Sequence, residues 1–271
     1  PHNDFDKYLA ETKDNWNRQL GKIEVTGDNK DDKVNFYTAL YHTMIAPTIY
    51  SDVDGAYYGP DKKIHQTDGW VNYGTFSLWD TYRAEHPLLM LMKPDEARDM
   101  VMSMIRHQQQ SVHGLLPVWS HMANDNWCMS GYHATSVLAD AISKGADIDV
   151  DEALKAMVTT SNVDYFDGIG DYIRLGYVPL EVSGTAASTT LEYAYDDWTI
   201  YWTALKAGNN EVAEKYRERA LNYRRIFDET LGFARPRYRD GTFKKDFDVL
   251  QTYGEGFIED ELCGCTFRIS P

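Results

Sequence analysis

The sequence of 271 residues has little cysteine, no basic excess and no long apolar run, and each shortage excludes a class of protein. Two of its three cysteines stand in Cys263-Gly264-Cys265, too close for an ordinary disulfide and without the second ligand pair that zinc needs. We therefore expect free thiols. The formal net charge of -15 disfavours nucleic acid or an anionic membrane as partner. No apolar stretch of the sequence is long enough to span a bilayer.

The composition is typical of one large globular domain. Hydrophobic residues make up 43% of the chain and aromatic residues 13%, which indicates an ordered protein. A compact domain of this length buries about three quarters of its unfolded surface. The chain begins with Pro1 and shows no signal-peptide pattern, so we expect a processed or excised segment.

Apolar residues recur at helical spacing along most of the chain, and alternating strand patterns are scarce. The helix over residues 34–45 is apolar nearly all round, so we expect it to be buried on most sides. A loop is expected over residues 172–179. The pattern predicts an all-α fold, a helical toroid with a site at one end, where loops and helix starts gather rings and carboxylates. The other helices are expected over residues 5–24, 93–107, 137–142, 188–208 and 211–229, and a further one opens in the run over residues 76–83. In the helix over residues 93–107, Met100, Met104 and Ile105 are expected to face inward.

One acidic run resembles a metal-binding loop in its spacing. It reads Asp147-Ile148-Asp149-Val150-Asp151-Glu152 and precedes a helical segment. It lacks the glycine that a calcium loop needs, and acids at this place cap free N–H groups and complement the helix dipole. The run therefore predicts a helix N-cap.

The stretch over residues 51–87 is the strongest candidate for a ligand site. Aromatic rings can cover the C–H faces of a sugar, while aspartate and arginine bond its hydroxyls. A buried carboxylate with no partner is costly, so such groups have either structural partners or a ligand. The structural alternative is an ion pair between Asp80 and Arg83 within one helical turn. The residues Trp79, Asp80, Tyr82 and Arg83, which follow the acidic turn at Asp52 and Asp54, fit both readings.

Five motifs follow one another along nearly the whole chain. They are Ser51-Asp52-Val53-Asp54-Gly55, Phe76-Ser77-Leu78-Trp79-Asp80-Thr81-Tyr82-Arg83 with His86-Pro87, Met129-Ser130-Gly131-Tyr132-His133-Ala134, Thr190-Leu191-Glu192-Tyr193-Ala194-Tyr195-Asp196-Asp197-Trp198, and Gly232-Phe233 with Arg235-Pro236-Arg237. This ordered set resembles the calcium-dependent exo-α-mannosidases of glycoside hydrolase family 92.

The resemblance implies a fold and an activity. The fold is an (α/α)6 barrel, present here as an incomplete catalytic domain over residues 31–271 after a helical linker over residues 1–30. The activity is inverting hydrolysis of terminal α-mannose from N-glycans or mannan, with a calcium ion that helps to distort the sugar. Members are usually exported by bacteria, so the resemblance implies a periplasmic or secreted protein.

The resemblance also implies roles for particular residues. An inverting glycosidase uses two carboxyl groups about 6.5–9.5 Å apart, one as acid and one as base. The family's acid lies in a Gly-Phe-x-Glu segment, matched by Gly256-Phe257-Ile258-Glu259, so Glu259 is the expected acid. The expected sugar-binding wall of the site consists of Asp52, Asp54, Trp79, Asp80 and Arg83. Tyr195, Asp196 and Asp197 either support that wall or pack between helices, and His133 is expected to be a hydrogen-bonded core histidine.

The similarity stops after Glu259, so residues 260–271 are expected to be an atypical tail, from a frame change or a truncated gene model. The family's base, its main calcium-binding segment and its β-sandwich domain would lie outside this chain, as would the remaining barrel helices. Loss of the base removes about 10²–10⁴-fold of rate, so we expect this segment alone to lack catalysis. The alternatives are a non-catalytic carbohydrate-binding or interaction module, and an α/α-barrel glycosidase acting on glucosides.

Overall fold

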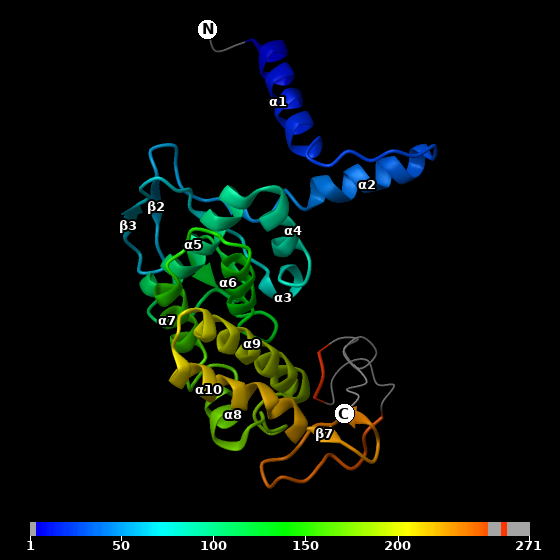
Figure 1. The fold of residues 1–271 in the computed structure, drawn as a ribbon, viewed down its shortest axis with the longest axis vertical. Helices are drawn as coiled ribbons and strands as arrows, with labels where there is room; N and C mark the ends of the chain where they lie inside the picture. The colour runs from blue at the N-terminus through cyan, green and yellow to red at the C-terminus, as the bar shows by residue number, and fades with distance from the viewer. Residues whose placement is uncertain (1–3, 249–255, 259–271) are drawn as a thin grey trace. The chain divides into compact units, whose positions relative to one another are not determined.

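The computed structural model describes residues 4–248 and 256–258. The chain divides into two compact units, Pro1–Thr48 and Ile49–Pro271 (Figure 1). The expected division at residue 30 stays a prediction. Glu259 and the tail over residues 260–271, on which two further predictions rest, lie outside the described residues.

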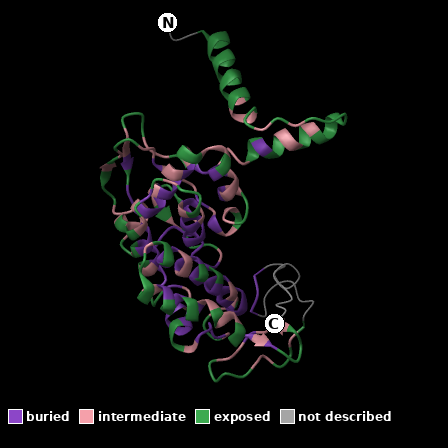
Figure 2. Ribbon diagram, viewed as in Figure 1, coloured by how far each residue is buried: buried purple, intermediate pink, exposed green. Residues whose placement is uncertain are grey.

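The first unit contains two capped helices, α1 (Phe5–Leu20) and α2 (Lys30–His42). The Asn29 side chain accepts a hydrogen bond from Asp31 N and begins α2. The expectation that the second helix is buried on most sides is wrong, because Leu40 is its one buried residue. Within the described part of this unit α1 is the other helix, and it offers too little surface to cover α2 all round (Figure 2).

The second unit is built from helices with short hairpins between them, so the all-α prediction is confirmed. Two antiparallel strand pairs, β2 with β3 and β5 with β6, join residues close in sequence, and β7 pairs with β8. The helices are α3 (Leu78–Thr81), α4 (Glu85–Met92), α5 (Pro94–Gln110), α6 (Ala134–Ser143), α7 (Val150–Thr160), α8 (Ile169–Leu175), α9 (Ala186–Lys206), α10 (Asn210–Arg219) and the 3₁₀ helix η1 (Ala220–Arg225). The strands are β1 (Thr48–Ile49), β2 (Ala56–Tyr58), β3 (Ile64–Gln66), β4 (Tyr73–Gly74), β5 (Ser120–His121), β6 (Asn124–Asp125), β7 (Phe227–Asp228) and β8 (Phe233–Ala234).

Two expected elements differ from the structure. The segment over residues 172–179, expected to be a loop, begins with the last turn of α8. This helix is flanked by Gly168 and Gly176, and both glycines adopt the left-handed conformation. Glycine adopts that conformation without strain, so the two residues delimit a helix too short to show periodicity in the sequence. The helix expected over residues 211–229 ends at Arg219, continues as η1 and is followed by β7.

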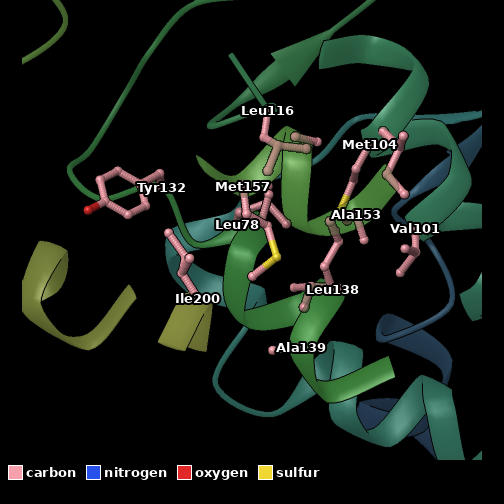
Figure 3. Close-up of a cluster of buried hydrophobic side chains, with 14 of the residues drawn as sticks. Leu78, Val101, Met104, Leu116, Tyr132, Leu138, Ala139, Ala153, Met157 and Ile200 are labelled. Carbon is pink, nitrogen blue, oxygen red and sulfur yellow. The ribbon is translucent and has the colours of Figure 1, made fainter. Parts of the chain in front are cut away.

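The core of the second unit lies around α9, which packs against α6, α7, α10 and η1. Figure 3 shows side chains from several helices converging, among them Met104, Leu138, Met157 and Ile200, all fully buried. Burying a side chain of this size contributes about 1.5–3 kcal/mol. The three residues predicted to face inward on α5, namely Met100, Met104 and Ile105, are buried.

The acidic run before α7 acts as a helix cap. The Asp149 side chain accepts hydrogen bonds from Asp151 N at 2.9 Å and Glu152 N at 3.0 Å. The N-cap prediction is therefore confirmed.

Across residues 4–248 and 256–258, the structure shows no helix with the length and apolar character that a membrane crossing requires.

Candidate functional site

A buried glutamate on α9 holds two of the predicted sugar-binding residues together. Glu192 Oε1 accepts hydrogen bonds from Trp79 Nε1 and from Arg83 Nη2, both at 3.2 Å. Arg83 Nε also donates to the Trp79 carbonyl at 3.2 Å, and its guanidinium carbon lies 5.2 Å from the Trp79 ring centroid. The Glu192 side chain is 8% exposed and that of Arg83 is 41% exposed. The charge of Arg83 is therefore anchored on its protein side and accessible on the other.

His133 extends this cluster into the core. Its Nδ1 lies 2.9 Å from Asp196 Oδ1, and its Nε2 lies 3.4 Å from Glu192 Oε2 without hydrogen-bond geometry. The spacing of four residues places Glu192 and Asp196 on one face of α9. Burial opposes the charge of His133, but the two carboxylates outweigh it and raise its pKa. The expected hydrogen-bonded core histidine is confirmed.

Two neighbours fix the ring of His133. Tyr82 stacks on it at 4.2 Å between centroids with 13° between planes. A Cβ at Gly131 would clash with the ring at Nε2, and Gly131 has φ +88°. This close approach and this conformation both require glycine. The packing of His133 therefore explains why the motif over residues 129–134 contains a glycine two residues before this histidine.

Asp197 belongs to a second buried cluster. Its Oδ1 accepts from the Tyr132 hydroxyl at 2.7 Å. Its Oδ2 accepts from the Tyr172 hydroxyl and from Arg219 Nε, each at 2.9 Å. Burial raises the pKa of Asp197 to about 6, against the opposing charge of Arg219. Tyr195, in contrast, is 40% exposed and its hydroxyl lies 3.1 Å from that of Ser136.

The predicted acids lie in different places. Asp52 and Asp54 are exposed in the turn before β2, where Asp54 Oδ1 accepts from Ala56 N at 3.0 Å. Among the described residues, no hydrogen bond joins either of them to Trp79 or Asp80. Asp80 is exposed on α3, and burial raises its pKa while Arg83 lowers it.

A further carboxyl lies beside Asp80. Burial raises the pKa of Glu85 to about 7, and the charge of Asp80 adds to the shift. Sequence reasoning missed Glu85, although its place five residues after Asp80 in the same motif was visible. It also missed Glu192 as the partner of Arg83, because 109 residues separate them.

A hollow of about 980 Å³ extends from this cluster over α6 and α9. Arg83 and Glu192 line it together with a row of aromatic side chains on α9, namely Tyr195, Trp198 and Trp202. This volume lies near the upper limit of the range found for small-molecule sites in proteins. Carboxylate and guanidinium groups beside exposed rings suit a ligand with many hydroxyls and apolar C–H faces, which is the chemistry of a sugar.

The calcium ion that the sequence resemblance implies has no ligand set in the described part of the chain. Within residues 4–248 and 256–258, no group of three or more His, Cys, Asp or Glu side chains could hold a metal ion. The clustered carboxylates are occupied by Arg83, His133 and Arg219.

The helical fold and a cluster of groups suited to binding a sugar define a carbohydrate-active domain. Comparison with known proteins identifies its family. The profile of the glycosyl hydrolase family 92 catalytic domain matches residues 1–270. The chain belongs to this family. A comparison with curated proteins returned no significant match.

Solved structures from Bacteroides thetaiotaomicron are similar to this chain. The family 92 α-mannosidase BT3965, in complex with mannoimidazole, shares 38% identity with a TM-score of 0.90 over 94% of this chain. The family 92 inverting mannosidase BT2199 shares 32% identity with a TM-score of 0.86, also over 94% of this chain. The chain spans 34% and 36% of the lengths of these two proteins, about a third of each.

Proposed function

We propose that this chain is the part of an exo-α-mannosidase catalytic domain that carries one wall of the sugar site and the general acid. The observation that carries the proposal is the family match over residues 1–270. The similarity to BT3965, an α-mannosidase solved with mannoimidazole, supports mannose as the sugar. Hydrolysis would proceed with inversion, as in the inverting mannosidase BT2199.

The residues of the cluster would bind and orient the sugar. Trp79 presents a ring whose indole N–H is already bonded to Glu192, which fixes its orientation. Arg83, held on the same carboxylate and 41% exposed, would contact sugar hydroxyls with its guanidinium. Asp80, exposed on the same short helix, accepts from hydroxyls. Holding the sugar in one orientation lowers the entropic part of the barrier.

The acid in this proposal is Glu259, which would protonate the departing glycosidic oxygen. The base that activates water would come from a segment outside this chain, as would the β-sandwich domain, the remaining barrel helices and the calcium ligands. Asp52 and Asp54, both exposed before β2, would contact the sugar only together with such segments. Bacterial export and N-glycans or mannan as substrates stay predictions from the family resemblance.

The test is mannoside hydrolysis by the natural protein and by two variants. Glu259→Gln should lower kcat for an unactivated α-mannoside by about 10²–10⁴-fold, because general acid catalysis contributes that much, and should abolish the alkaline limb of its pH profile. Glu261→Gln, two residues further on, is the matched control and should keep both. Glucoside turnover without mannoside turnover would refute the assignment. Mannoside binding without turnover would favour a carbohydrate-binding module instead.

A further inference from the structure

His133 connects the buried core to two residues of the sugar-binding wall, through the carboxylate of Glu192. Its Nδ1 lies 2.9 Å from Asp196 Oδ1, and its Nε2 lies 3.4 Å from Glu192 Oε2. The other oxygen of Glu192 accepts from Trp79 Nε1 and from Arg83 Nη2, each at 3.2 Å. One carboxylate therefore faces the histidine with one oxygen, and the tryptophan and arginine with the other.

The protonation state of His133 determines what faces Glu192. The neighbouring Asp196 carboxylate accepts a hydrogen bond, so the ring keeps a proton on Nδ1 in both its charged and its neutral form. In the charged ring Nε2 carries a second proton and attracts the Glu192 carboxylate. In the neutral ring Nε2 presents a lone pair, which repels that carboxylate. The loss of one proton therefore reverses the sign of this contact.

The surroundings hold the ring and its partners in these places. Tyr82 stacks on the ring at 4.2 Å between centroids. Asp196 is itself fixed, because its Oδ2 accepts from Tyr132 N at 2.7 Å. His133 and Asp196 are both buried, so water does not replace a lost partner easily. A change at Nε2 is therefore transmitted to Glu192.

The groups around His133 favour its charged form. Burial lowers the pKa of the histidine, but Asp196 and Glu192 on α9 raise it by more, against an opposing effect of Arg83. Tyr82, which packs on the ring directly after α3, stays neutral because burial raises the pKa of its hydroxyl. The folded protein therefore holds this proton below the raised pKa and loses it as pH rises through that value.

We propose that His133 is a positioning residue of the sugar site, which in its protonated form holds Glu192 where that carboxylate fixes Trp79 and Arg83. When the proton is lost, Glu192 moves away from Nε2 and its two donors lose a fixed acceptor. Trp79 and Arg83 bind sugar and transfer no proton, so the loss affects KM more than kcat. The inference rests on the proposed function for the identity of the ligand.

The first test is a double-mutant cycle in the natural protein, with para-nitrophenyl α-mannoside as substrate. This aryl leaving group departs with little help from a general acid, so the readout depends less on Glu259. His133→Gln should raise KM by about tenfold and change kcat less. In a Glu192→Gln background the same substitution should have no further effect, because His133 acts through that carboxylate. A full additional effect in this background would overturn the inference.

The pH dependence of KM separates the proton of His133 from its packing. In the wild type KM should rise as pH increases through the pKa of the histidine, and in His133→Gln this rise should be absent. Asp196→Asn keeps the shape of the side chain but removes a charge that favours the proton, so the rise should move to lower pH by about one to three pH units. This variant also decides the matter if His133→Gln does not fold, since an unchanged profile would contradict the inference.

His86→Gln is the matched control. His86 is 2% exposed, as is His133, and lies on α4, where burial lowers its pKa to about 4. It carries no charge in the range of the titration. The variant should lose stability in urea unfolding but keep KM and its pH dependence. An equal change of KM in both histidine variants would mean that His133 has a packing role alone.

The indole N–H resonance of Trp79 gives a readout that needs no sugar. It is recorded in the natural protein with isotope-labelled tryptophan and identified by its absence in Trp79→Phe. It should move as pH passes through the titration of His133, and this movement should disappear in His133→Gln. Glu85 titrates at about 7 in the same region, so Glu85→Gln is included and should keep the movement.

The two readouts distinguish the inference from the proposed function. A Trp79 resonance that stays still, or that moves equally in His133→Gln, would refute the positioning role. A resonance that behaves as expected in a protein that hydrolyses no mannoside would refute only the proposed activity.

Discussion

Replacing Asp197 by alanine tests the second buried cluster most directly. The Asp197 carboxylate is fully buried and accepts from two tyrosine hydroxyls and from Arg219. Arg219 is itself 9% exposed, so its charge would lose its partner in a site that water hardly reaches. Removing one partner of a buried ion pair costs about 3–5 kcal/mol. Folded domains have about 5–15 kcal/mol of stability in total, so this single change would remove a large fraction.

The assay is urea unfolding followed by circular dichroism, with the wild type and two controls. Glu214→Ala breaks the pair with Arg217 on α10, whose side chains are 59% and 56% exposed, and should leave the free energy of unfolding almost unchanged because water screens exposed charges. Asp197→Asn keeps the shape and part of the hydrogen bonding, and should fall between the two. Equal losses for Asp197→Ala and Glu214→Ala would refute the argument that Arg219 is left as an uncompensated buried charge.

Three further predictions concern the site and the helix ends. Glu192→Gln keeps an acceptor for Trp79 but removes the charge that holds Arg83, so kcat/KM for an α-mannoside in the natural protein should fall about tenfold to a hundredfold; wild-type kinetics would contradict this. The pKa of Glu85 is about 7 in the folded state against an ordinary 4.5. The folded state therefore holds a proton that the unfolded chain releases in this window, so stability falls as pH rises from about 4.5 to 7. Glu85→Gln should reduce that fall, measured as the difference in urea midpoint between pH 4.5 and pH 8; an unchanged difference would show that Glu85 does not cause it. Asp149→Ala should cost about 1 kcal/mol because two N–H groups at the start of α7 lose their acceptor, and an unchanged thermal midpoint would exclude the cap.

The correct predictions from the sequence concern local patterns. The helix periodicity that identified the inward residues of α5, and the cap at Asp149, depend on neighbours within one or two turns. The ordered motifs indicated the family because each is a short run of residues, and the match over residues 1–270 agrees with that prediction. The errors arose where the local pattern was weak or misleading: α8 is short and lies between glycines, and α2 has apolar residues without a surface to cover them.

The sequence by itself therefore determined the all-α class, the family and the residue types of a sugar site, since these follow from spacing and short-range order. Only the tertiary structure decided which groups meet. Arg83 is bonded to Glu192 across 109 residues, and Asp196 to His133 across 63. A hollow of about 520 Å³ is lined by residues as far apart in the sequence as Trp127 and Ile258. Such contacts depend on how helices pack around α9, and a side chain's nearest partner in space has no fixed offset in the sequence.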